Sequence, residues 1–213
     1  ELKAQGIDAK GFIADLMNRD QVKSTVKEIE KEFGRIDVLV NNAGMVQVGG
    51  EEDFGYVEEI TYESWDESIN RNLTLTFNVT KEVLPVMLKN NYGRIVNISS
   101  VTGPTVSNPG EAAYSAAKAG VLGMSRALAI ETGGRGITVN CVLPGWIATA
   151  SQTEEEAVGG ENTPLGRGGS ATEVANAAVF LASKEASYIT GEYIVVDGGN
   201  TIQEYKGPKE SYY

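Results

Sequence analysis

The chain has 213 residues, of which 41% are hydrophobic, and its 29 acidic against 18 basic side chains give a formal net charge of −11. The length favours one domain with a real core, and the acidic balance argues against nucleic acid as a partner. Histidine is absent, which excludes Ser-His-Asp triads, Cys-His pairs and His-based zinc sites; we expect no metal site, and proton transfer must rest on Tyr, Lys, Asp or Glu. The single cysteine, Cys141, excludes an intrachain disulfide and favours a reducing compartment.

The sequence gives no sign of a membrane or secretory segment. No stretch approaches the roughly 18 to 20 apolar residues that a membrane span requires. The first residues, ELKAQGIDAK, have neither the basic start nor the apolar run of a signal peptide. We therefore expect a cytoplasmic protein that does not interact with a membrane.

Strands and helices alternate along the sequence. Short β-branched runs predict strands, those of 35–44 and 93–100 with the pattern of burial on both faces. Apolar residues at helical spacing predict helices, the first of them closed by Gly34 and the last started by Ser170 with Glu173 in its first turn. This alternation favours a single α/β domain over residues 1–213, a doubly wound parallel sheet with helices on both faces. In chain order we expect a strand in 8–16, a helix in 18–34, a strand in 35–44, a helix in 61–90, a strand in 93–100, a helix in 111–132, a strand in 136–145, a helix in 170–183 and a strand in 191–199.

Two segments, 45–65 and 144–169, are polar, acidic and rich in glycine. Each follows the carboxyl end of a predicted strand, which is where ligands bind in an open α/β sheet. We expect these segments to line the site, with 145–170 as a substrate loop. Most of their acidic side chains are open to a simpler interpretation as solvated surface.

Tyr114 and Lys118 lie four positions apart in an alanine-rich predicted helix. One turn separates them, so their side chains are neighbours. They form either a surface pair or a proton donor with the cation that tunes it. A free phenol has a pKa of about 10, and a close ammonium favours the phenolate and lowers that pKa.

Six motifs follow one another in the predicted elements: NNAG at 41–44, Asn72, Ser100, the pair Tyr114 and Lys118, PGWIAT at 144–149, and ITGEYIVVDGG at 189–199. Together they resemble the short-chain dehydrogenase/reductase family, in particular its 3-oxoacyl-carrier-protein-reductase-like members. The resemblance implies a Rossmann-like fold and an NAD(P)-dependent oxidoreductase. Such an enzyme interconverts a secondary alcohol and a ketone by hydride transfer.

The resemblance also implies four catalytic residues. Tyr114 is the general acid/base, and Lys118 supports it and holds the nicotinamide ribose. Ser100 gives its hydroxyl to the substrate oxygen, with Ser99 as the adjacent alternative. Asn72 is implied to anchor a water that links Lys118 to solvent.

The cofactor contacts implied by the resemblance lie at the ends of the strands. Asn41 is also open to a plain role as a turn residue at a strand end. The family's glycine-rich turn and first strand-helix-strand portion are absent from this sequence, so a preference for NAD or NADP cannot be assigned. The sequence is either part of a longer natural chain or a truncated product. The implied cofactor residues are Asp15 at the adenine; Asn41, Ala43 and Gly44 at the adenosine ribose; Pro144, Gly145, Ile147 and Thr149 at the nicotinamide; and Tyr114 and Lys118.

We expect a small, neutral ketone or alcohol as substrate. Acyl carrier proteins are acidic and favour basic surfaces, whereas this chain offers Arg135 but has Asn90 and Asn91 where a basic pair would help. The resemblance implies a homodimer or homotetramer. Two alternatives stay open: a cofactor-free remnant that serves as an interaction or structural subunit, and an isomerase or epimerase that retains a bound cofactor.

Overall fold

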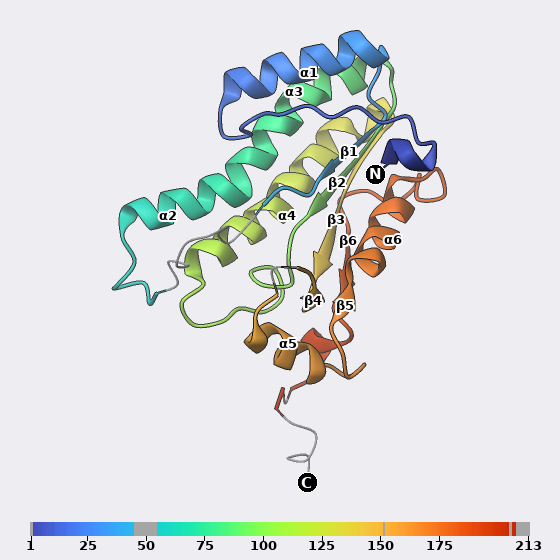
Figure 1. The fold of residues 1–213 in the computed structure, drawn as a ribbon. Coiled ribbons are helices and arrows are strands. Elements are labelled where there is room, and N and C mark those ends of the chain that lie inside the picture. Colours follow the sequence, from blue (N-terminus) through green and yellow to red (C-terminus); the bar gives the residue numbers. More distant parts are fainter. Residues whose placement is uncertain (1, 45–54, 151, 205, 208–213) are drawn as a thin grey trace.

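The computed structural model describes residues 2–44, 55–150, 152–204 and 206–207. A parallel sheet with the strand order β1-β2-β3-β6 forms its centre (Figure 1). Neighbouring strands pair in register, as Asn41 with Asn97 and Asn97 with Cys141 show. The strands are β1 Val38–Asn41, β2 Gly93–Ile98, β3 Ile137–Pro144 and β6 Tyr193–Val196.

Helices cover both faces of this sheet (Figure 1), which confirms the predicted doubly wound α/β architecture. Three helices, α1 Arg19–Phe33, α3 Leu75–Lys89 and α4 Ala112–Thr132, pack on one face, and α6 Ala171–Ala182 packs on the other. The helix α2 Tyr62–Ile69 continues through a π-helical turn, Asn70–Thr74, into α3. The remaining elements are β4 Ile147–Ala148, α5 Glu154–Glu161, β5 Gly169–Ser170 and the 3-10 turns Leu2–Gln5, Gly133–Arg135 and Asn200–Ile202.

The core is divided by the sheet because successive strand residues point to opposite faces. On the first face, Ile95 and Val139 pack against Met87 of α3 and the valines of α1. On the second face, Val96 and Val142 pack against α6 through Ala178 and Leu181. Both faces of the sheet are therefore packed against helices through apolar side chains, as is typical of parallel strands.

Local sequence signals fix the ends of two helices as predicted. The side chain of Asn18 accepts hydrogen bonds from the main-chain N–H groups of Asp20 and Gln21, and Gly34 closes α1 in a left-handed conformation at φ 75°. At α6, Ser170 and Glu173 form a reciprocal capping box. These caps satisfy main-chain groups that a helix end leaves without partners.

The predicted strand in 8–16 is not formed. Residues 7–15 have no regular structure, although burial alternates from Phe12 to Leu16 as it would along a strand, and Ile13 is fully exposed. A strand is stabilised by hydrogen bonds to a neighbour, and among the described residues nothing pairs with this segment. Leu16 nevertheless anchors the segment, because its carbonyl oxygen accepts a hydrogen bond from Nδ2 of Asn78 at 3.0 Å.

The strand predicted in 35–44 is present as β1, but it is not buried on both faces. Val38 and Val40 are 42% and 44% exposed. β1 is the outer strand of the sheet in the described part of the chain, and only β2 pairs with it. The β-branched sequence of β1 is typical of a strand buried on both faces, but in the described residues this strand has a neighbouring strand on one side only.

The segment 144–169, predicted to be irregular, contains the helix α5 and the strand pair β4 and β5. Thr153 accepts a hydrogen bond from the main-chain N–H of Glu156, and the Glu156 carboxylate accepts one from the N–H of Thr153. This capping box starts α5, a helix that its own two glycines, Gly159 and Gly160, disfavour on propensity alone.

Part of the other predicted loop, residues 45–54, lies outside the described residues. The remainder leads into α2, whose first turn is capped by the hydroxyl of Thr61. Within the described ranges, no helix combines the length and hydrophobicity that crossing a membrane requires.

Candidate active site

The predicted site residues gather where the parallel strands end. Gly44 follows β1, Ser100 follows β2, and Gly145 follows β3. The strands run in the same direction, so these positions meet at one edge of the sheet. The amino-terminal half of α4 contacts β3 and the π-helical turn at this edge and brings Tyr114 and Lys118 to it.

Tyr114 and Lys118 lie together as the sequence spacing predicts. The Nζ atom of Lys118 is 5.5 Å from the centroid of the Tyr114 ring. Lys118 is only 5% exposed, and its Nζ donates a hydrogen bond to the carbonyl oxygen of Ile98 at 3.5 Å. Of the two interpretations of this pair, an exposed surface pair is therefore excluded.

Burial lowers the pKa of Lys118 to about 8, because a low-dielectric environment disfavours the charged amine. At neutral pH the side chain still carries its proton for most of the time. A cation held so close to an aromatic ring and kept from solvent interacts with that ring more strongly than an exposed one would.

The two serines after β2 point in different directions. The Ser99 hydroxyl is buried and donates a hydrogen bond to the main-chain carbonyl oxygen of Lys118 at 2.9 Å. The Ser100 hydroxyl is partly exposed and accepts a hydrogen bond from the N–H of Thr102 at 3.1 Å. Of the two alternatives, Ser100 is thus the more exposed residue.

Gly44, Asn72 and Lys118 converge on one point. A side-chain carbon on Gly44 would lie 3.2 Å from Nζ of Lys118 and 3.4 Å from Oδ1 of Asn72. Asn72 is 2% exposed, and its Nδ2 donates to the carbonyl oxygen of Ser68 at 3.1 Å. Its position in a π-helical turn was not predicted; such turns are frequent at functional sites.

The side chain of Asn41 is buried in the core of the molecule. Its Nδ2 donates hydrogen bonds to Oδ1 of Asn97 at 2.8 Å and to Oγ1 of Thr80 at 3.0 Å. Asn97 in turn donates to the hydroxyl of Ser125 on α4 at 2.8 Å. The side chain of Asn41 therefore joins β1, β2 and two helices, whereas Ala43, two residues on, is exposed.

The residues after β3 are held by main-chain contacts. The N–H of Val101 donates to the carbonyl oxygen of Pro144, and the N–H of Gly145 donates to that of Val196, both at 3.0 Å. A side-chain carbon on Gly145 would lie 2.6 Å from Cβ of Asp197, so only glycine fits there. Further along, Ile147 pairs with Gly169 and leads to Thr149.

Asp15 is the predicted site residue that the structure does not bring to a strand end. It lies in the irregular segment, is exposed, and its carboxylate accepts a hydrogen bond from the N–H of Met17 at 2.9 Å. The reason is the missing strand pairing described above. Its expected place at the tip of a strand therefore has to be corrected.

Two features near the site were missed by sequence reasoning. Glu111 stands one helical turn before Tyr114; partial burial raises its pKa, and the carboxylate of Glu156 on α5 adds to this effect. The i, i+3 spacing to Tyr114 is the signal that could have found Glu111. Trp146, inside PGWIAT, packs on Gly159 of α5, where an added side-chain carbon would lie 2.7 Å from its ring.

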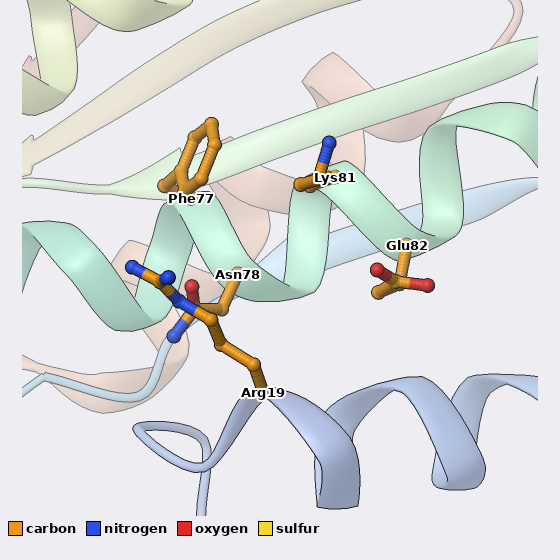
Figure 2. A pocket seen from close by; sticks show the side chains of 5 residues that line it. All are labelled: Arg19, Phe77, Asn78, Lys81 and Glu82. Carbon is orange, nitrogen blue, oxygen red and sulfur yellow. The ribbon is translucent and has the colours of Figure 1, made fainter.

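A separate hollow lies where α1 meets α3, and none of the candidate catalytic residues lines it. Figure 2 shows Arg19 reaching from the start of α1 toward the side chains of α3. Two of the lining residues, Lys81 and Glu82, carry opposite charges. The full lining is Arg19, Phe77, Asn78, Lys81 and Glu82.

The chain thus has a doubly wound α/β sheet with a buried lysine beside a tyrosine at its strand ends. Comparison with known proteins specifies the family: residues 1–201 match the family model described as enoyl-(acyl carrier protein) reductase. The chain belongs to the short-chain dehydrogenase/reductase family, whose members are NAD(P)-dependent enzymes that act on CH–OH groups.

Its relatives include proteins named 3-oxoacyl-(acyl-carrier-protein) reductase FabG. The chain is 44% identical to that of Thermotoga maritima over 208 residues, which cover 94% of this chain and 81% of the relative. It is 41% identical to that of Staphylococcus aureus Mu50 over 205 residues, or 93% and 80% of the two chains. Identity to the Escherichia coli K12 protein is 42% over 198 residues, or 91% and 78%.

Proposed function

We propose that this chain interconverts a ketone and a secondary alcohol with Tyr114 as the general acid/base. The observation that carries the proposal is the burial of Lys118 beside the Tyr114 ring, together with Gly44 and Asn72. Burying an ammonium lowers the stability of the fold unless other interactions compensate. In this proposal the buried ammonium has a function: it makes the proton of the Tyr114 phenol easier to transfer.

The residues of the site fit the nicotinamide half of an NAD(P) cofactor. Gly44 leaves open the space next to Lys118 and Asn72 that a side chain would fill, and Lys118 presents an amine that can donate to ribose hydroxyls. Pro144, Gly145, Ile147 and Thr149 would hold the carboxamide, and Asn41 supports the neighbouring backbone of Ala43 through its core hydrogen bonds. When bound, the cofactor supplies or accepts the hydride.

The chain's own groups would act on the carbonyl oxygen. Negative charge develops on that oxygen as the ketone is reduced, and fixed donors stabilise it. Ser100 donates its hydroxyl, and Tyr114 transfers its proton to the oxygen. Lys118 favours the phenolate that remains, and Asn72 would hold a water beside Lys118. In the reverse direction the Tyr114 phenolate accepts the proton of the alcohol.

The charge around the site supports an uncharged substrate of low molecular weight. Glu111 lies one turn from Tyr114, and Glu156 faces it from α5. The relatives' names specify an acyl-carrier-protein substrate, and such a carrier is acidic, so these carboxylates oppose it. Initial rates with an uncharged 3-oxoacyl ester should exceed those with the same acyl group on an acyl carrier protein at moderate salt; the reverse order would contradict this substrate class.

Substitution of Tyr114 by Phe tests the assignment of the general acid/base. The ring and its packing remain while the proton is lost, so we expect kcat to fall by roughly the 10²- to 10⁴-fold that positioned acid–base groups supply. Tyr188, a fully exposed tyrosine, provides the matched control, and Tyr188→Phe should leave kcat unchanged. Full activity of Tyr114→Phe would refute the assignment.

The alternative that the sequence leaves open, a cofactor-free interaction subunit, makes the opposite prediction for nucleotide binding. Titration of the chain with NADH and NADPH, followed by nicotinamide fluorescence, separates the two functions and assigns the cofactor preference. No response to either nucleotide would favour the interaction subunit, and turnover without net change of the nicotinamide would favour an isomerase or epimerase.

We further propose association into a homodimer or homotetramer through the helices that carry Asn72 and Tyr114. Phe77 on α3 is 46% exposed and Ile130 on α4 is 86% exposed. Large apolar side chains on two helices are typical of an interaction surface. Light scattering coupled to size-exclusion chromatography measures the mass directly.

A further inference from the structure

Ser99 makes a buried contact that the proposed reaction does not use. It follows β2 directly and is 4% exposed. Its main-chain N–H donates to the carbonyl oxygen of Val142 on β3 at 2.9 Å, which fixes the residue to the sheet. Its hydroxyl donates in the other direction, to the carbonyl oxygen of Lys118 on α4 at 2.9 Å. One short side chain thus joins the centre of the sheet to a helix.

The two ends of this hydrogen bond are next to the reacting groups. The donor, Ser99, precedes Ser100 in the chain, and the acceptor is the main chain of Lys118 itself. The bond therefore links the strand end next to Ser100 to the helical turn that carries Tyr114 and Lys118. Displacements of about 1 Å at such a place cost an enzyme up to about 10²-fold in rate.

A second contact joins the segment that follows β2 to α4, but this contact is open to water. The hydroxyls of Ser107 and Ser115 are 2.7 Å apart, and both lie at the surface. A hydrogen bond that is shielded from water is stronger and persists longer than an exposed one. The Ser99 hydroxyl is also a shorter contact than the other buried hydrogen bond at this strand end, from Nζ of Lys118 to the carbonyl oxygen of Ile98 at 3.5 Å, and unlike that bond it reaches the main chain of α4.

We propose that Ser99 is a positioning residue, which sets the distance between the Ser100 hydroxyl and the Tyr114 and Lys118 pair. The proposal rests on the proposed function, in which these three groups act on one oxygen. Ser99 itself does not touch the substrate. Its effect is transmitted through the main chain of Ser100 and Lys118.

Ser99→Ala removes the hydrogen bond and leaves a small buried residue, so the variant is expected to fold. We expect kcat for ketone reduction to fall about tenfold while the KM for the ketone changes less than about twofold, because Ser99 does not touch the substrate. Ser125→Ala is the matched control. Its hydroxyl is as buried as that of Ser99 and likewise links α4 to β2, through Asn97, but it lies on α4 two turns beyond Lys118. This control should keep kcat within about twofold.

The same substitution in a Tyr114→Phe background distinguishes positioning from general weakening of the fold. If Ser99 acts through Tyr114, the tenfold effect disappears in the double variant, since coupled residues are not additive. An equal loss in both backgrounds, or an equal loss in Ser125→Ala, would overturn the proposal.

A measurement without turnover separates this proposal from the proposed function. The titration of Lys118 is followed by NMR of ¹³C-labelled lysines in the resting protein, its signal assigned by its loss in Lys118→Met. Loosening the enclosure admits water, so Ser99→Ala should move the pKa of Lys118 upward from about 8, and Ser125→Ala should not. An unchanged pKa in Ser99→Ala would overturn the positioning role. If that upward movement occurs in a chain with no oxidoreductase activity, the positioning role stands and the proposed function fails.

Discussion

The ammonium of Lys118 is held in a place that lowers its own pKa, with burial as the cause. In the unfolded chain the amine has its ordinary pKa of 10.5, so unfolding increases its affinity for a proton. Below about pH 8 both states are charged and the cost to folding is complete. Between about pH 8 and 10.5 the folded amine is neutral while the unfolded one is charged, so this group makes stability rise with pH. The site residue is therefore retained at the expense of stability at neutral pH.

Lys118→Met is expected to raise the free energy of unfolding at pH 7 by about 1–3 kcal/mol, since it removes a buried charge and keeps the apolar stem. The gain should shrink as the pH approaches 10.5, and activity should be lost at every pH. Thermal unfolding at pH 7 and pH 10 measures the first effect. Lys81→Met, at an exposed position on α3, is the control and should change neither quantity. A lower melting temperature of Lys118→Met at pH 7 would contradict the argument.

Sequence reasoning named candidate site residues, but it could not fix the direction of every side chain. Tyr114 and Lys118 were predictable because four positions in a helix always place two side chains on one face. Ser99 and Ser100 were not separable, because they follow the last residue of β2 and the turn of the chain there decides which hydroxyl reaches the site. The π-helical turn at Asn72 leaves no mark in the sequence.

At the scale of elements, α5 and the segment 8–16 differ from prediction for opposite reasons. The capping box of Thr153 and Glu156 is a local signal, and it was overlooked among glycines and acidic residues. The strand expected at 8–16 has a strand-like sequence, but hydrogen bonds to a neighbour decide whether a strand forms, and no local pattern contains them. The helices α1, α4 and α6 and the strands β2, β3 and β6 have both a local signal and a partner, and they appear as predicted. The helix predicted in 61–90 is interrupted by the π-helical turn, and β4 and β5 were not predicted.

Thr153→Ala tests whether the capping box maintains α5. Loss of an N-cap costs about 1 kcal/mol, and a helix of eight residues with two glycines has little else to stabilise it. We expect faster hydrogen exchange of the amides of α5 and a raised KM, with little change in melting temperature. Ser170→Ala removes the equivalent cap from α6, which packs in the core, and should lower the melting temperature instead. Unchanged exchange in α5 after Thr153→Ala would show that other contacts hold it.

At the scale of the whole molecule, the described sheet is shielded unequally. α6 and the group formed by α1, α3 and α4 cover its two faces (Figure 1). Among the described strands, β1 pairs on one side only, and its Val38 and Val40 are exposed. Free edges of parallel strands bind other strands. Just before β1, Arg35 forms an ion pair with Asp37, so charged side chains lie next to the start of this edge.

Val40→Lys is therefore expected to reduce self-association of the chain by severalfold at a given concentration. A lysine on an edge strand disfavours the addition of a further strand, because its charge would then lose contact with water. Turbidity and light scattering on warming measure the effect. Val57→Lys adds the same charge at an exposed valine away from the sheet and should leave association unchanged. Equal effects of the two variants would show that net charge, and not the edge of β1, is responsible.

The contact between Asn41 and Asn97 limits where residues can be inserted into or deleted from this chain. The two amides are register partners on adjacent strands, so a single inserted or deleted residue before either of them would set an apolar side chain opposite a dehydrated amide. Length variation is tolerable in 145–170, whose elements lie outside the main sheet, but not in β1 or β2. Attempts to redesign substrate preference would therefore succeed by remodelling α5 and its flanks while the two asparagine-bearing strands stay untouched.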